Sequence, residues 1–244
     1  VLYTGNSASD NSGTTQSITG VGFKPDLVWI KRRDGAENHY VHDSTRGSTK
    51  QIYTNLTNAE YDESNSVISF DADGFTLGGY NGSNNIGETY VAWSWKAGGA
   101  ARNNTDGTIT SQVSANVDAG FSIVQYTGTG SLATVGHGLN QPVELILVKN
   151  TSASASWAVY SAPTGINKFL ELNSTGAAIS YSNYWGAATP TNDVFGVVNG
   201  NFNNNATNAS LIAYCFHSVA GYSKIGSYTG NGSTTGPIVT LGFE

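Results

Sequence analysis

Histidine and carboxylate side chains gather in the stretch HYVHDSTRG. His39, His42 and Asp43 carry atoms that bind zinc, but the odd spacing of the two histidines places them on opposite faces of a strand. No cysteine or further histidine cluster lies nearby in the sequence. Asp43 and Arg46 are three residues apart and precede a glycine, which favours an ion pair closing a turn over a ligand clamp. We therefore expect no metal site here.

Other carboxylates also lack the pattern of a reaction centre. The DADG stretch at 71–74 partly matches a calcium loop, but it lacks the third oxygen ligand and the distal Glu, and a hairpin turn accounts for it. Calcium bridging acidic turns stays open as an alternative. Asp62, Glu63 and Glu88 are candidates for a glycoside-hydrolysing pair, yet nothing in the sequence joins them across a cleft. Nucleophile-elbow, phosphate-loop and dinucleotide motifs are missing from the sequence. We expect a non-enzymatic protein without a cofactor.

The best candidate for ligand recognition is the stretch ISYSNYWGAATPTND, residues 179–193. Its aromatic residues stand among Ser, Asn, Gly and Pro, a composition typical of a loop. Exposed rings beside amide and carboxylate groups bind sugars, because the ring packs on the apolar sugar face while the polar groups meet the hydroxyls. Packing of these rings into the end of a sheet structure is the competing interpretation. The candidate glycan-binding residues are Tyr181, Asn183, Tyr184, Trp185 and Asp193.

Composition excludes several classes of partner. The 244 residues contain 30 Gly and 11% charged residues, and the formal net charge is −6. An acidic chain without a basic stripe is not expected to bind nucleic acid. There is no apolar run of membrane-spanning length, so we expect no membrane insertion. The single cysteine, Cys215, lies in the apolar run LIAYCF and is expected in the core.

Short runs rich in β-branched and aromatic residues predict an all-β protein. They are separated by Gly, Asn and Asp clusters, and the Asp73-Gly74 step predicts a hairpin. Six or more strands in each part of the chain indicate antiparallel β-sandwiches. In YVAWSWK, Trp93 and Trp95 share one face, which we expect on the core. DLVWIK is apolar on both faces, typical of a central strand or of one covered by a neighbouring module.

The sequence also repeats itself. Tyr3, Tyr126 and Tyr228 open three similar stretches, and TYVAWSWKAGG resembles SLIAYCFHSVAG. The offsets of 123 and 102 residues between the tyrosines are the size of small domains. We predict two tandem modules at 1–99 and 120–226, joined by a linker at 100–119 whose later part could add an edge strand. Residues 227–244 are expected to be the opening strand of a third repeat or the closing strand of the second, in a piece of a longer repeated protein.

One resemblance adds to this interpretation. GVGFKPDLVWIKRRDG, HDSTRG, SFDADGFTLGG and YVAWSWKAGG resemble a repeated module of tail-fibre and other virion proteins of tailed bacteriophages. The resemblance covers nearly all of residues 1–99; over 120–221 it is weaker, and no HDSTRG counterpart is visible there. It implies a jelly-roll or concanavalin A-like sandwich fold, and it implies no catalytic residues.

Two functions follow as expectations. The first is a virion surface protein, of tail fibre or head decoration, that mediates virion architecture and associates with other virion proteins and with its own copies. The alternative is an adhesin that binds a host-surface polysaccharide weakly in each module, with many copies supplying avidity. Both place the protein at the virion surface, outside the cell.

Overall fold

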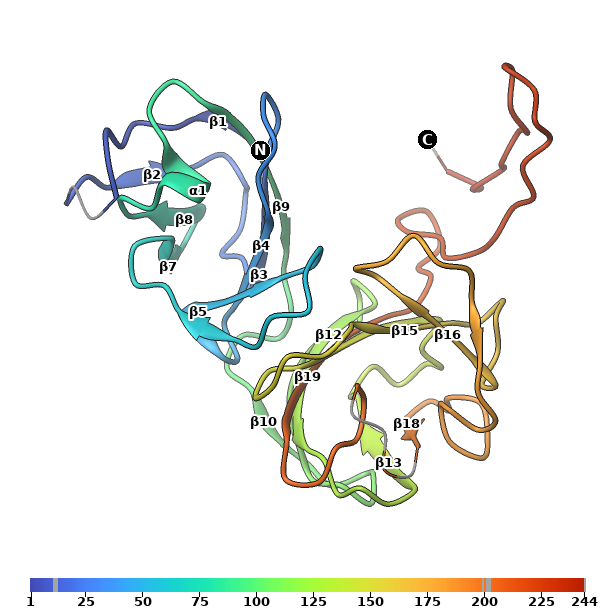
Figure 1. Ribbon diagram of the computed structural model, residues 1–244. Helices are drawn as coiled ribbons and strands as arrows, with labels where there is room; N and C mark the ends of the chain where they lie inside the picture. Colours follow the sequence, from blue (N-terminus) through green and yellow to red (C-terminus); the bar gives the residue numbers. More distant parts are fainter. Residues whose placement is uncertain (11–12, 199, 201–202, 244) are drawn as a thin grey trace.

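The computed structural model describes residues 1–10, 13–198, 200 and 203–243 (Figure 1). It is all-β, as the sequence predicts, and its strands form antiparallel sheets. α1 (Asn81–Asn84) is a single helical turn. We call residues 1–99 the N-terminal half and the remaining described residues the C-terminal half.

Two sheets make up the N-terminal half. The larger has the order β1-β9-β3-β4-β5-β6, and the smaller has the order β2-β8-β7. The core between them joins Val28, Ile30 and Tyr90 of the larger sheet to Phe75 and Leu77 of the smaller. The strands are β1 (Leu2–Thr4), β2 (Gln16–Ile18), β3 (Leu27–Arg32), β4 (His39–Asp43), β5 (Gly47–Tyr53), β6 (Tyr61–Asp62), β7 (Val67–Asp71), β8 (Gly74–Leu77) and β9 (Thr89–Trp95).

The C-terminal half repeats this layering. Its larger sheet has the order β10-β11-β12-β19-β14-β15-β16-β17, and its smaller sheet consists of β13 and β18. Val124 and Ala213 of the larger sheet pack with Val135 and Phe195 of the smaller. The strands are β10 (Arg102–Asn104), β11 (Ser111–Asn116), β12 (Phe121–Thr127), β13 (Ala133–Gly136), β14 (Leu145–Asn150), β15 (Ala158–Ser161), β16 (Lys168–Glu171), β17 (Ile179–Ser180), β18 (Val194–Val197) and β19 (Ser210–Phe216).

The two larger sheets share strand order and register. The order β1-β9-β3-β4-β5-β6 corresponds to β12-β19-β14-β15-β16-β17. Leu27 lies opposite Trp95, and Leu145 lies opposite Phe216. A side-chain contact repeats as well: the amides of His39 and Trp157 donate to the side-chain oxygens of Asn55 and Asn173, at 3.0 and 2.8 Å. Leu27 and Leu145, His39 and Trp157, and Asn55 and Asn173 are each 118 residues apart, as are Lys31 and Lys149. Trp95 and Phe216 are 121 residues apart.

A third core lies between the two larger sheets. Leu27, Val41 and Ile52 of the N-terminal half pack there with Ile123 and Ile212 of the C-terminal half. The alternation of β3 is thereby explained, since Val28 and Ile30 face one core while Leu27 faces the other. The strand is both central in its sheet and covered by the other half.

The expected orientation of β9 is wrong. Tyr90 and Ala92 face the core of the N-terminal half, whereas Trp95 packs against the core between the halves. Trp93 is 46% exposed. Aromatic content does not identify the inner face here, because the other face also serves as an interface.

Two segments differ from what the sequence predicts for them. The stretch expected as a linker contains β10 and β11, and β11 pairs with both β10 and β12. Residues 227–243 form neither of the strands considered for them, and Ile238 is 96% exposed. The hairpin at Asp73-Gly74 is confirmed as β7–β8, where Asp71 pairs with Gly74.

Candidate functional site

A buried cluster of charged side chains joins the two halves. Arg46 Nε lies 2.5 Å from Asp43 Oδ2, and Arg46 Nη1 lies 2.9 Å from Glu60 Oε2. The hydroxyl of Tyr214, from the C-terminal half, donates to Asp43 Oδ2 at 2.7 Å. The side chains of Asp43 and Arg46 are 0% and 2% exposed. Each charge in the cluster therefore has a partner, which burial of ions requires.

The β4–β5 turn positions this cluster. Asp43 Oδ1 accepts hydrogen bonds from the backbone amides of Thr45 and Arg46, at 3.0 and 2.9 Å. Gly47 follows with a φ of 113°, a conformation that favours glycine. The predicted ion pair closing a turn is confirmed, and the structure adds the tyrosine that the sequence did not indicate.

The environment fixes the protonation states of the cluster. Burial lowers the pKa of Arg46, but the charge of Asp43 and the contacts with Tyr214 and Glu60 outweigh it, so the pKa is raised overall. Burial also raises the pKa of the Tyr214 hydroxyl well above its usual value. The guanidinium thus stays charged and the phenol stays protonated as a donor. Neither group is placed to exchange a proton near neutral pH, so the cluster fits a structural role.

Two further contacts cross between the halves. Lys149 is fully buried, and its Nζ donates to the carbonyls of Thr57 and Ala155 at 3.0 and 2.7 Å. Burial lowers the pKa of Lys149 to about 8. The indole of Trp157 donates to the carbonyl of Tyr53 at 2.7 Å. These bonds join the larger sheet of the C-terminal half to the end of β5 and the loop that follows it.

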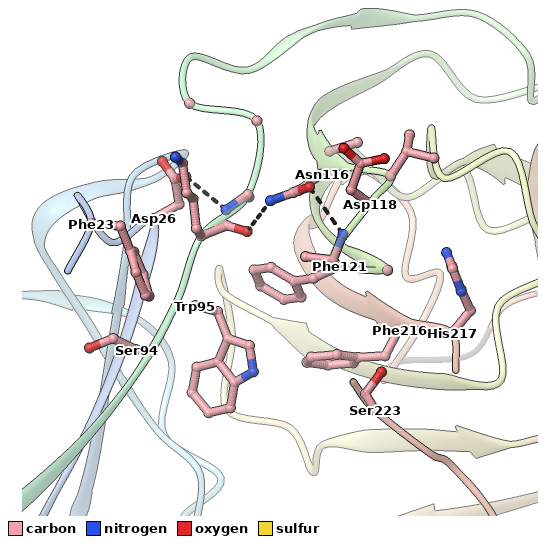
Figure 2. Close-up of a pocket in the computed structure, with 18 of the residues that line it drawn as sticks. Phe23, Asp26, Ser94, Trp95, Asn116, Asp118, Phe121, Phe216, His217 and Ser223 are labelled. Carbon is pink, nitrogen blue, oxygen red and sulfur yellow. Dashed lines mark hydrogen bonds between the residues drawn. The ribbon is translucent and has the colours of Figure 1, made fainter. Parts of the chain in front are cut away.

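A groove of about 1490 Å³ opens at the end of the interface (Figure 2). The rings of Trp95, Phe121 and Phe216 lie along it, and the centroids of Trp95 and Phe216 are 6.5 Å apart. Figure 2 shows Phe23 across from these rings and His217 and Ser223 at the opposite side. The groove therefore combines aromatic surface with polar groups.

Few polar groups in this groove are free. The carboxylate of Asp26 accepts hydrogen bonds from Ser44 Oγ and the Ala97 amide, both at 2.8 Å. His217 is 9% exposed, and its Nε2 lacks a hydrogen-bond partner among the described residues. Asp26 and Asp118 are the carboxylates among the lining residues. The carboxylate of Asp26 is thus engaged in holding the fold.

The proposed sugar-binding loop is divided by the structure. Tyr184 and Trp185 are both 0% exposed and belong to the core of the C-terminal half. Tyr184 stacks on Phe169 with ring centroids 4.0 Å apart, and the Trp185 indole donates to the Lys168 carbonyl. These two rings cannot stack on a sugar in this arrangement. They pack into the end of the sheet structure, as the competing interpretation has it. Tyr181, Asn183 and Asp193 are exposed.

The histidines of β4 face opposite sides, as their spacing predicts. His42 is buried and contacts Ser48 O and Ser66 Oγ, at 2.7 and 3.1 Å. His39 lies on the other face, next to Trp29. Among the described residues, no group of three His, Cys, Asp or Glu side chains is placed to hold a metal ion.

Three other carboxylates named in the sequence analysis make local contacts. Asp73 accepts hydrogen bonds from the amides of Gly20 and Gly22. Asp62 pairs with Lys50, and Glu88 pairs with Arg32, so these two acids are engaged in separate ion pairs. Calcium binding at the acidic turns remains a prediction.

Cys215 is buried as expected. No helix in the described part of the chain has the length and apolar character needed to cross a bilayer.

Comparison with known proteins gives a family. The whole sequence, residues 1–244, matches the family described as "Domain of unknown function (DUF7483)". The chain belongs to this family. Neither the curated proteins nor the solved structures contain a match to it. In this DUF7483 chain, the groove lies at the end of a buried interface between the halves.

Proposed function

We propose that this chain is a non-enzymatic structural module at the surface of a tailed-phage virion. In this proposal each half is a β-sandwich of the jelly-roll or concanavalin A-like type, and the two sandwiches stand in tandem. The virion assignment rests on the resemblance of the sequence motifs. The sandwich assignment is supported by the two layers in each half and by the repeated strand order.

The observation that carries the architectural role is the buried interface between the halves. A structural spacer must hold a fixed shape, and here the charged cluster of Asp43, Arg46 and Tyr214 joins an apolar core drawn from both halves. Tandem domains joined only by a linker move relative to each other, whereas a large apolar interface opposes such motion. The pair of halves therefore serves as one rigid unit.

The test is to look for the chain in virions. Particles of a phage that encodes the chain are purified, their proteins are identified by mass spectrometry, and an antibody against the chain locates it by immunogold electron microscopy. We expect peptides from both halves and labelling of tail fibres or head. Peptides found only in the lysate, with none in purified particles, would refute the proposal.

A second candidate function, glycan binding, is favoured by the groove. Its rings at Trp95 and Phe216 and its polar lining residues His217 and Ser223 provide the apolar and polar groups that a sugar needs. Binding of host-surface polysaccharide is measured by calorimetry on wild type and on His217→Ala. Tyr222→Ala probes another residue that lines the groove. Unchanged binding in both variants would place any glycan site elsewhere.

A further inference from the structure

Within the chain, the N-terminal half covers one specific face of the C-terminal half. That face consists of Lys149, Trp157 and Tyr214 on the larger sheet, and all three are at most 2% exposed. Two elements of the N-terminal half cover it: the end of β4, where Asp43 accepts the hydrogen bond of Tyr214, and the end of β5 with the loop after it, which supply the carbonyls of Tyr53 and Thr57 to Trp157 and Lys149. Val41 and Ile52 of the same strands pack on Ile212 beside this face, so the contact joins two different surfaces.

The N-terminal half carries an equivalent face that the other described residues leave partly exposed. By the shared registers, Lys31, His39 and Trp93 correspond to Lys149, Trp157 and Tyr214. Trp93 is 46% exposed whereas Tyr214 is 2% exposed. Leu2, on the neighbouring strand, is 64% exposed. We call Leu2, Lys31, His39, Val91 and Trp93 the open face.

The open face is continuous with the established interface. Trp29, which packs on the core between the halves, also contacts Trp93 and His39, with ring centroids 6.0 and 6.1 Å apart. The indole nitrogen of Trp29 and Nδ1 of His39 are buried without a hydrogen-bond partner among the described residues. Apolar surface and unpaired polar atoms thus occur together at the positions where the C-terminal half is covered.

The C-terminal half carries an equivalent of the covering loop. Asn173 makes the same contact with Trp157 that Asn55 makes with His39, so the loop after β16 corresponds to the loop after β5. Thr175 therefore corresponds to Thr57, and residues 174–177 are exposed. In Figure 1, β16 lies on the side of the C-terminal half away from β9, so this loop does not reach the open face of its own chain.

We propose that copies of this chain associate head to tail, the exposed loop at 174–177 of one copy covering the open face of the next. The inference deepens the proposed architectural role and rests on it. Both surfaces needed for the contact are left exposed, and the chain already joins their equivalents internally. Because the two surfaces differ, the contact is heterologous and builds either a closed ring or an extended row of copies.

Crosslinking tests the proposal directly. Lys31→Cys and Thr175→Cys are prepared as separate variants and mixed with a short bis-maleimide; the native Cys215 is buried and does not compete. We expect a crosslinked dimer in the mixture that neither variant gives alone. A mixture of Lys31→Cys with Tyr222→Cys is the matched control, since Tyr222 is 64% exposed and lies outside the contact. A yield no higher than in this control would overturn the proposal.

Sedimentation of the intact chain supplies a second readout. Trp93→Ser should lower the association constant about tenfold or more, because an aromatic residue at the centre of an interface commonly carries much of the binding energy. Tyr222→Ser should leave it unchanged. A wild-type chain that stays monomeric at its highest soluble concentration would refute the head-to-tail contact while leaving the virion proposal intact. If the chain is absent from virions but still gives the crosslinked dimer, the virion proposal is refuted and the head-to-tail contact stands.

Discussion

The hydroxyl of Tyr214 donates a hydrogen bond of 2.7 Å to Asp43, a carboxylate 171 residues earlier in the chain and buried in the other half. Tyr214→Phe removes this donor, together with the longer contact of 3.4 Å that the hydroxyl accepts from Arg46 Nη2. A buried charged acceptor that loses a partner costs about 1–3 kcal/mol of stability. Urea denaturation should show this loss, whereas Tyr222→Phe, at an exposed tyrosine, should match wild type. Equal stability of the two variants would show that the bond contributes nothing.

Arg46→Met should be more damaging. It leaves Asp43 and Glu60 without their shared cation, and removing one partner of a buried ion pair costs about 3–5 kcal/mol. Denaturant midpoints measure the loss. Arg32→Met is the comparison: Arg32 also joins two acids, Asp34 and Glu88, but at the surface. A loss for Arg46→Met no larger than that for Arg32→Met would contradict the importance assigned to burial.

The stability of the fold should fall in mild acid through His42. Burial, followed by the charge of Arg46, lowers the pKa of His42 to about 4. Between pH 6.5 and 4 the unfolded chain takes up a proton that the folded chain does not, so stability declines as the pH falls through this window. The contribution is on the order of 3 kcal/mol. Denaturation at pH 7 and pH 5 should show a steeper decline for wild type than for His42→Gln; parallel declines would exclude this histidine.

Cys215 should be unreactive until the chain unfolds. Burial raises the pKa of its thiol, which suppresses the nucleophilic thiolate. In native buffer a thiol reagent should modify the chain slowly, and in urea one thiol per chain should react rapidly. Fast modification of the folded chain would mean that the core of the C-terminal half opens readily.

The aromatic loop should contribute to stability. Trp185→Ala removes a fully buried ring, a change that typically costs about 3–5 kcal/mol. Tyr181→Ala, four residues earlier and 44% exposed, should cost far less. Thermal unfolding compares the two. A stable Trp185→Ala variant with lost polysaccharide binding would instead restore the sugar-binding interpretation of this loop.

The local features of the fold could be predicted from sequence, and the contacts between halves could not. The hairpin at Asp73-Gly74 and the Asp43–Arg46 pair depend on neighbours in sequence, and both are present. Tyr184 and Trp185 lie in a segment with loop composition, and their burial depends on residues distant in sequence: Tyr184 stacks on Phe169, and Trp185 packs against Tyr160. No local signal points from Asp43 to Tyr214.

The face of β9 shows why alternation alone was insufficient. Trp93 and Trp95 form the more aromatic side, yet Tyr90 and Ala92 on the other side fill the inner core. A strand with two covered faces satisfies either assignment, and only knowledge of the second half decides between them. The second half supplies Phe216, whose ring lies 6.5 Å from that of Trp95 at the interface.

The position of β19 has a mechanical consequence. It is paired with β12 over seven residues and with β14 over six, so both of its edges are bonded. β1, in contrast, is three residues long and bonded to β9 alone. A pulling force that enters the fold after Phe216 must shear two ladders at once, whereas a force entering at Leu2 peels one short ladder pair by pair. Under tension β1 should therefore detach first, while the strands of the C-terminal sheet stay paired.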